Sequence, residues 1–297
     1  MKKLPALLVP LCFYYTSLGQ PAPRYDTATI VLPEVFDKAV QISSLAWAGD
    51  SLYLPTEKCG TVLIGKLDSS GMKYREVNLG VRRQTEGMAY YKGNFYLSDD
   101  SAYKVYKYNK LFDTVTTYPI KLRAYDERIT GSNGFEGITV VNDSVFYLLL
   151  EKDKSNMYSV LYKGVLRNNQ VVVTDKRRIA VDRSSRYSDI YLRDSKLYLV
   201  KSSFYGGNCN TKNRYELRFL ELSDDMSVKK RDNVIETDLL ISLTGFVLAK
   251  CDSFNTNVEG ITMDNSGNFY IVSDNFFGNA CEAAGQRRTL LMRVASR

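Results

Sequence analysis

The sequence predicts an all-β fold, a five-bladed β-propeller, and three observations lead to this prediction. The 22 Tyr and 13 Phe, against one Trp, favour strands, because aromatic rings suit a pleated, half-buried surface. One hairpin motif occurs five times along the 297 residues. A strand-like segment near the N-terminus is left over, and such a segment commonly closes a propeller.

The repeated motif has two anchor positions. One is a Tyr followed four residues later by a polar or acidic residue: Tyr53 and Glu57, Tyr96 and Asp100, Tyr147 and Glu151, Tyr198 and Ser202, and Tyr270 and Asp274. The other stands ten or eleven residues before each Tyr: Ser43, Glu86, Glu136, Ser188 and Glu259. Between the anchors we expect a strand, a tight turn and a second strand, because turn residues such as Gly49-Asp50 tolerate hairpin backbone angles.

Each hairpin is followed by further strand-like segments, so a complete unit has four strands. The last unit has only three, ending in "TLLMRVA", and "DTATIVLP" at residues 26–33 supplies another strand. We therefore expect the N-terminal strand to complete the last blade and leave no open sheet edge. A six-bladed propeller is the alternative, with a degenerate blade at residues 237–250; otherwise this segment is a short helix or a packed loop.

The first 19 residues predict a secretory signal peptide. Lys2 and Lys3 precede an apolar run, and Ser17-Leu18-Gly19 precedes a cleavage site before Gln20. Residues 20–297 then form a single propeller domain. No later run is long and apolar enough to span a membrane. We therefore expect an exported protein, periplasmic or secreted, and a monomer.

Four cysteines remain after this cleavage: Cys59, Cys209, Cys251 and Cys281. An even number in an exported chain predicts two disulfides. Adjacency of the units favours Cys209–Cys251 and Cys59–Cys281, and pairing of Cys251 with Cys281 is the alternative. The formal net charge of +7 comes from scattered basic residues, without the clustered footprint that nucleic-acid binding needs.

The glutamates of the first anchor position predict a metal site. Glu86, Glu136 and Glu259 are each followed by Gly, which lets neighbouring backbones come close to the channel axis. No Lys or Arg stands at the equivalent positions, so the three charges repel one another unless a cation binds or protons are taken up. Oxygen ligands of this kind suit Ca²⁺. Weaker candidate ligands are Glu57, Asp100, Glu151 and Asp274. Alternatively, the glutamates accept backbone N–H bonds from the next blade and bind no metal.

The ordered set of motifs resembles the SdiA-regulated, YjiK-like proteins. It consists of "SSLAWAGDSLYL", "TEGMAYYKGNFYLSDD", "GFEGITVVNDSVFYLLLEK", "SDIYLRDSKLYLV" and "NVEGITMDNSGNFYIVSDN", with anchors in the order Ser, Glu, Glu, Ser, Glu. The resemblance implies a five-bladed propeller distantly related to NHL repeats, with calcium in the propeller facing Glu86, Glu136 and Glu259. The cysteines and the long loops at residues 203–212 and 276–287 depart from the family core.

The absence of histidine limits the possible functions. It removes Ser-His-Asp and Cys-His catalysis and any His-ligated metal. One hypothesis is a non-enzymatic, calcium-binding propeller that binds a protein, peptide or glycan at its loop-rich face. The alternative is a calcium-dependent hydrolase of phosphoesters or lactones, with Asp99 or Asp100 as base; Glu-Gly-Ile motifs also occur in esterase-like phytases. A third hypothesis is a purely structural or surface-adhesion module, in which the acidic residues only connect neighbouring blades.

Overall fold

The computed structural model describes residues 25–30, 41–68, 71–80, 84–99, 102–122, 134–223, 234–274 and 288–296. These residues form strands almost throughout, with one short helix. The predicted signal peptide lies outside the described residues. No helix in the described part of the chain has the length and apolar character needed to cross a membrane.

The strands form five antiparallel groups of four, which we call units 1 to 5. Unit 1 holds β2 (Ala46–Ala48), β3 (Ser51–Pro55), β4 (Thr61–Asp68) and β5 (Gly71–Asn78). Unit 2 holds β6 (Thr85–Tyr91), β7 (Asn94–Asp99), β8 (Lys104–Asn109) and β9 (Val115–Lys121). Unit 3 holds β10 (Phe135–Asn142), β11 (Val145–Leu150), β12 (Tyr158–Arg167) and β13 (Gln170–Ala180).

Unit 4 holds β14 (Ser185–Arg193), β15 (Lys196–Ser203), β16 (Arg214–Glu221) and β18 (Asp238–Ser242). Unit 5 holds β19 (Val258–Met263), β20 (Phe269–Ser273), β21 (Leu291–Ser296) and β1 (Tyr25–Thr29). Units 2 and 3 join into one larger sheet, because β9 and β13 pair in parallel and the short β17 (Val234–Ile235) also pairs with β13.

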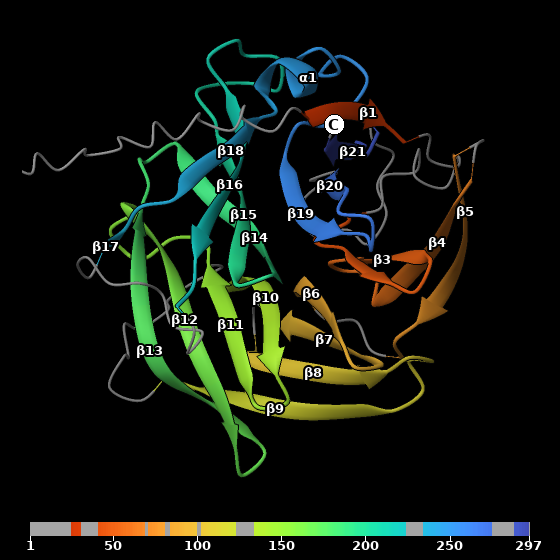
Figure 1. Ribbon diagram of the computed structural model, residues 1–297, viewed down its shortest axis with the longest axis vertical. Coiled ribbons are helices and arrows are strands. Elements are labelled where there is room, and N and C mark those ends of the chain that lie inside the picture. Colours follow the sequence, from red (N-terminus) through yellow and green to blue (C-terminus); the bar gives the residue numbers. More distant parts are fainter. Residues whose placement is uncertain are drawn as a thin grey trace, which may run out of the picture.

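The first strand of each unit lies at the centre of the molecule. These inner strands contact one another in a closed ring, in the order β2, β6, β10, β14, β19 and back to β2. Figure 1 shows β6, β10, β14 and β19 converging while the later strands of each unit spread outward. The ring puts the start of every inner strand, where the anchor residues stand, around one axis.

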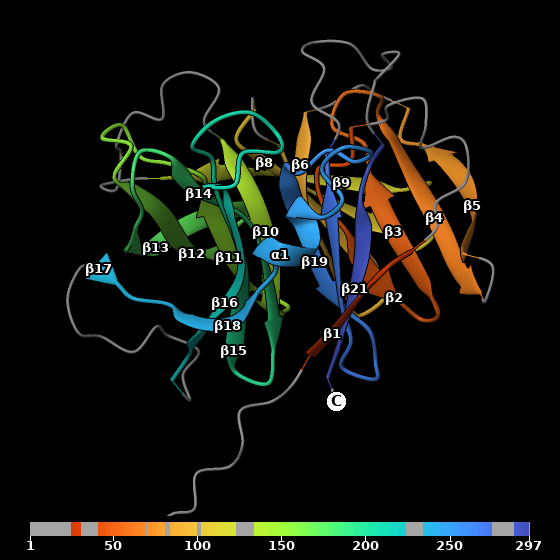
Figure 2. The ribbon, with the colours of Figure 1, turned by 90° about the horizontal axis from the view of Figure 1, so that it is seen from above.

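The N-terminal strand completes the last unit, as predicted. β1 pairs antiparallel with β21, from Tyr25 opposite Ser296 to Thr29 opposite Met292. Figure 2 shows β1 lying along β21 beside the C-terminus. The outer edge of β21 is thereby covered.

The predicted hairpin turns are also present. Positive φ angles occur at Gly49, Gly93, Asp194 and Gly267, where the inner strands turn into the second strands. Residues 237–250, considered above as a sixth blade or a short helix, contain β18, which is the outer strand of unit 4, and then α1 (Thr244–Leu248).

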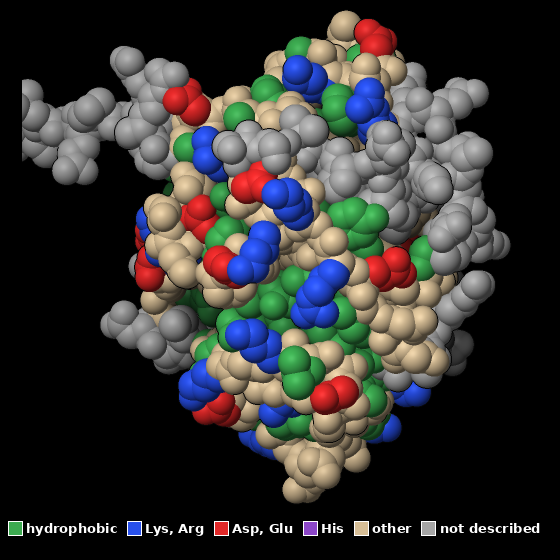
Figure 3. Space-filling view, turned by 90° about the vertical axis from the view of Figure 1, so that its right-hand side faces the viewer, with side chains coloured by type: hydrophobic (Ala, Val, Ile, Leu, Met, Phe, Trp, Pro, Cys, Tyr) green, Lys and Arg blue, Asp and Glu red, His purple; other side chains and the backbone are tan. Residues whose placement is uncertain are grey.

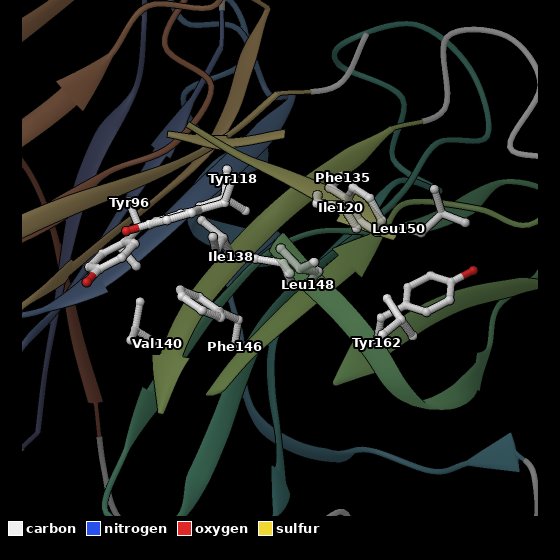
Figure 4. Close-up of a cluster of buried hydrophobic side chains, with 14 of the residues drawn as sticks. Tyr96, Tyr118, Ile120, Phe135, Ile138, Val140, Phe146, Leu148, Leu150 and Tyr162 are labelled. Carbon is white, nitrogen blue, oxygen red and sulfur yellow. The ribbon is translucent and has the colours of Figure 1, made fainter. Parts of the chain in front are cut away.

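Aromatic and aliphatic side chains fill the space between neighbouring sheets. Figure 4 shows the cluster between units 2 and 3. In it the rings of Phe135 and Tyr162 meet edge to face at 5.7 Å, and those of Tyr96 and Phe146 at 5.5 Å. Burying one such side chain stabilises a fold by about 1.5–3 kcal/mol. Aromatic side chains therefore pack between neighbouring sheets. This packing stabilises the arrangement of the inner strands.

Candidate functional site: an acidic channel end around Arg186

A β-bulge marks the anchor position in four units. The ladder between the first two strands shifts register between Thr85 and Met88 in unit 2, and between Phe135 and Gly137 in unit 3. The same shift occurs between Tyr187 and Asp189 in unit 4, and between Val258 and Gly260 in unit 5. A bulge leaves a residue unpaired and re-aims its side chain. The repeated Glu-Gly pair is therefore the sequence of a bulge at the start of an inner strand.

The glycine of each pair permits close packing of inner strands. A Cβ at Gly87 would lie 2.8 Å from the carbonyl oxygen of Glu136 in the next unit. A Cβ at Gly260 would lie 2.8 Å from Ser44 Cα in unit 1. The predicted close approach is thus confirmed, and the contact runs from one inner strand to the next.

Two units carry a polar residue where the others have this glycine. Ser44 of unit 1 and Asp189 of unit 4 meet, with the Ser44 hydroxyl donating to Asp189 Oδ2 at 2.8 Å. The Ile261 amide donates to the same oxygen at 3.0 Å, and the Ile190 amide donates to Oδ1 at 2.8 Å. Asp189 is fully buried, and this burial raises the pKa of its carboxyl well above the usual range. The sequence comparison missed Asp189, although a lone acid replacing a repeated glycine was a usable signal.

The serine anchors have a structural role. The Ser43 hydroxyl donates to the Thr85 carbonyl oxygen at 2.6 Å, and the Ser188 hydroxyl donates to that of Val258 at 2.8 Å. Each bond joins one unit to the next in the ring. The anchor position therefore serves to connect units wherever it holds serine.

Arg186 lies among the acids, although no Lys or Arg stands at the equivalent anchor positions. Its guanidinium donates to Glu151 of unit 3 through Nη1, and to Glu259 and Asn257 of unit 5 through Nη2. It also lies 5.6 Å from the centre of the Phe204 ring. The comparison of anchor positions missed Arg186 because it stands two residues before its anchor, Ser188.

Asn257 connects two further acids. Its amide donates to Glu259 and, at 2.8 Å, to Asp274 Oδ1. Glu259 and Asp274 are only 8% and 5% exposed, so both carboxyl groups are withdrawn from bulk water. Glu136 lies close enough for its charge to act on Arg186. We call Glu136, Glu151, Glu259 and Asp274 the acid cluster.

Burial and charge act in opposite directions in this cluster. Burial raises the pKa of Glu259 well above its usual range; Arg186 opposes this, while Asp274 and Glu151 add to it. Burial alone would lower the pKa of Arg186, but Glu259, Glu151 and Glu136 hold it above its ordinary value. Nearby Lys152 has its pKa lowered by burial. Four acids thus face one arginine and one half-buried lysine.

Two other sequence-predicted acids lie in units 1 and 2. Glu57 pairs with Lys58 at 2.9 Å, and Glu86 lies half-buried on β6. Asp99, a candidate base, accepts bonds from the Ala102 amide and the Tyr106 hydroxyl at 2.7 and 3.0 Å, which is a turn-forming role. Asp100 lies outside the described residues.

The acid cluster fits calcium by ligand type. Carboxylate and amide oxygens are the ligands that Ca²⁺ takes. Among the described residues, however, no three acids have oxygens all within 4.8 Å of one another. In the described part of the chain, the one group that meets this distance contains Cys209, Cys251 and Asp252, and its two cysteines are joined in a disulfide.

This disulfide confirms one predicted pair. Cys209 and Cys251 are bonded, with their Cα atoms 5.3 Å apart. Cys59 is also disulfide-bonded. Its predicted partner, Cys281, lies outside the described residues, so that pairing stays a prediction.

The four-stranded units around a closed ring of inner strands define a class, the β-propellers. The family model for the esterase-like activity of phytase matches residues 63–277, more than half of the chain. The chain therefore belongs to this esterase-like phytase family. The resemblance to SdiA-regulated proteins stays a prediction.

Solved structures support the propeller fold. Myxococcus xanthus glutaminyl cyclase is similar with a TM-score of 0.50 and 10% identity over 92% of this chain and 95% of its own. The α-L-arabinofuranosidase CtGH43 from Clostridium thermocellum is similar with a TM-score of 0.52 and 12% identity, over 84% of this chain and 88% of its own. The Bacteroides ovatus xyloglucan PUL GH43B is similar with a TM-score of 0.53 and 13% identity, over 90% of this chain and 54% of its own. At these identities the likeness concerns the fold alone.

Proposed function

We propose that this protein is an exported ester hydrolase whose reaction site is the acid cluster around Arg186. The observation that carries the proposal is the surplus of carboxyl groups in one place, Glu136, Glu151, Glu259 and Asp274, against Arg186 and Lys152, with Glu259 and Asp274 buried. Membership of the esterase-like phytase family supports the reaction class. The five units of four strands, closed by β1, support a count of five blades with this site at one end of their channel.

The carboxyl groups supply an acid and a base without histidine. Glu259, whose pKa burial raises, would protonate the leaving oxygen. Glu136, whose charge acts on Arg186, would take the proton from the attacking water. Carboxyl groups in different environments divide the two roles in this way in known hydrolases. Arg186 orients Glu151 and Glu259 from a fixed position.

Calcium is the second part of the proposal. A phosphoester is an anion, so a surplus of carboxylates would repel it unless a cation is present. The cluster and the Asn257 amide offer the oxygen ligands that calcium takes. When bound, calcium would polarise an ester oxygen and lower the pKa of a bound water.

A non-enzymatic binding protein for a protein, peptide or glycan is the second candidate. One observation favours it: Arg186 connects unit 3, through Glu151, to unit 5, through Asn257 and Glu259. This role of Arg186 is structural and requires no catalysis. In this candidate the acid cluster stabilises the loop-rich face to which a ligand binds.

One assay separates the two candidates. The purified chain would be tested on phytate, p-nitrophenyl phosphate, p-nitrophenyl butyrate and a γ-lactone, with calcium and with a chelator. Hydrolysis lost in Glu259→Gln and retained in Glu221→Gln, an exposed glutamate on β16, supports the hydrolase. No turnover of any substrate by the folded protein rejects it and leaves the binding protein.

A further inference from the structure

We propose a second binding site, for a small ring compound that carries a carboxylate, sulfate or phosphate group, in a cavity between units 1 and 2. The cavity has a volume of about 640 Å³. This lies within the range of about 300–1,000 Å³ that is usual for small-molecule sites. It is separate from the acid cluster and does not depend on the hydrolase proposal.

The cavity lies at the other end of the propeller from the acid cluster. It is lined by the β2–β3 turn at Gly49 and Asp50, by the paired strands β4 and β5, and by Lys110 after β8. In an antiparallel unit these turns lie opposite to the start of the inner strand. Since Arg186 stands at such a start, the two sites lie at opposite ends.

The floor of the cavity is apolar and aromatic. Tyr53, Ile64 and Tyr74 line it. The ring of Tyr53 packs against that of Phe95, with the two ring centres 4.3 Å apart. Figure 3 shows this side of the molecule, with Lys and Arg side chains around a hollow that has a hydrophobic floor. Tyrosine rings in such a floor pack against the face of a ring compound.

The rim of the cavity has a surplus of positive charge. Lys66 pairs with Asp50 at 2.7 Å, and Lys73 pairs with Asp68 at 3.1 Å. Both lysines are well exposed, at 69% and 82% of their side chains. Exposed pairs of this kind contribute only about 0–1 kcal/mol, so they do not remove the lysines from use by a ligand.

Two further cations on the rim determine the class of ligand. Arg75 and Lys110 form no ion pair with an acid of the described residues, and both are exposed. Arg75 lines the same cavity as Tyr53, and its charge acts on the Tyr53 hydroxyl. An arginine fork binds carboxylate, sulfate or phosphate through two parallel hydrogen bonds. One anionic group over an aromatic floor is the chemistry that this cavity fits.

Calorimetric titration with matched sugars tests the site. Glucuronate, galactose 6-sulfate and glucose 6-phosphate would be compared with neutral glucose and with inorganic phosphate, on the full chain. We expect at least one acidic sugar to bind, with no heat from glucose. Arg75→Gln should weaken this binding at least tenfold, and Arg75→Gln with Lys110→Gln should abolish it. Lys212→Gln, an exposed lysine between β15 and β16, is the control and should change nothing.

Several results would overturn the proposal. Absence of binding by all three acidic sugars, or an unchanged affinity in Arg75→Gln, would remove the site. Equal binding of inorganic phosphate and glucose 6-phosphate would show an ion site without recognition of a ring. Because Arg75 is exposed on an outer strand, the variant should fold, and an unchanged circular dichroism spectrum would verify this. Hydrolase activity should be the same in these variants, so the two proposals fail independently.

Discussion

The hydroxyl of Ser44 donates a 2.8 Å hydrogen bond to the buried carboxyl group of Asp189, joining units 1 and 4. These units are not neighbours in the ring of inner strands. The Met88 amide of unit 2 donates to the same hydroxyl at 3.0 Å, and the Ile261 amide of unit 5 donates to the same carboxyl at 3.0 Å. Four of the five units thus meet at one pair of side chains.

Removing this pair should show strong coupling. Ser44→Ala and Asp189→Ala each leave buried polar partners unsatisfied, which costs about 1–3 kcal/mol per group. In a double-mutant cycle by urea unfolding, we expect a coupling energy of about 1–3 kcal/mol. Glu76→Ala, at an exposed position on β5, is the control and should change the free energy of unfolding by less than about 0.5 kcal/mol. Additive effects of the two single substitutions would contradict a shared role.

Asp189 should also make stability depend on pH. Its pKa is raised by burial in the folded protein, so the folded state holds this proton more tightly than the unfolded chain does. The contribution is fully present below the unfolded value of about 4 and is lost as the pH rises through the folded pKa. We expect the loss of stability above pH 4 to be less steep in Asp189→Asn than in the wild type. Parallel curves of unfolding free energy against pH would disprove this.

Arg186 should stabilise the protein through its charge. Arg186→Gln leaves Glu151 and Glu259 without their guanidinium partner, and loss of one member of a buried pair costs about 3–5 kcal/mol. The loss should be largest at neutral pH and smaller at acid pH, where the carboxyl groups take up protons. Added calcium should raise the melting temperature of this variant more than that of the wild type. An equal calcium effect on both proteins would argue against a shared cation position.

The glycines of the inner strands should be sensitive to a single methyl group. Gly260→Ala puts a Cβ 2.8 Å from Ser44 Cα, which is backbone that cannot easily move. We expect a loss of about 1–3 kcal/mol from this overpacking. Gly245→Ala in α1 meets nothing within 4 Å and is the matched control. In a helix this change should stabilise by up to about 1 kcal/mol. Chemical denaturation of the two variants measures both.

The Cys209–Cys251 disulfide should stabilise the loop between β15 and β16 against the segment that follows α1. It closes a loop with a sequence separation of 42, and loops of this length correspond to about 2–4 kcal/mol. The double variant Cys209→Ser with Cys251→Ser should unfold at lower urea under non-reducing conditions. An unchanged midpoint would show that the bond adds nothing to the folded state.

The repeated features of this fold could be predicted from the sequence, because the motif for each of them occurs several times along the chain. The hairpins follow from the recurring turns, and the N-terminal strand was the one segment left to complete unit 5. The close approach at Gly87 and Gly260 followed from a glycine at the same place in each copy.

What could not be predicted lies where one unit departs from the repeat. Arg186 and Asp189 each occur once, on either side of the anchor Ser188, and both decide the electrostatics of the channel. Arg186 reaches Glu151 across units through a long side chain, so its contact depends on three-dimensional placement. A comparison of equivalent positions shows what the units share, whereas the candidate site is built from what they do not share.

If the acid cluster performs hydrolysis, turnover should depend on Glu136, and the variant Glu136→Gln tests this. The rate on p-nitrophenyl phosphate and phytate at saturating calcium would be compared with the wild type and with Glu221→Gln, at equal melting temperature. Loss of a general base typically lowers the rate about 10²–10⁴-fold, so we predict a loss of at least a hundredfold in Glu136→Gln alone. Equal turnover in all three proteins would contradict the assignment of the reaction to this cluster.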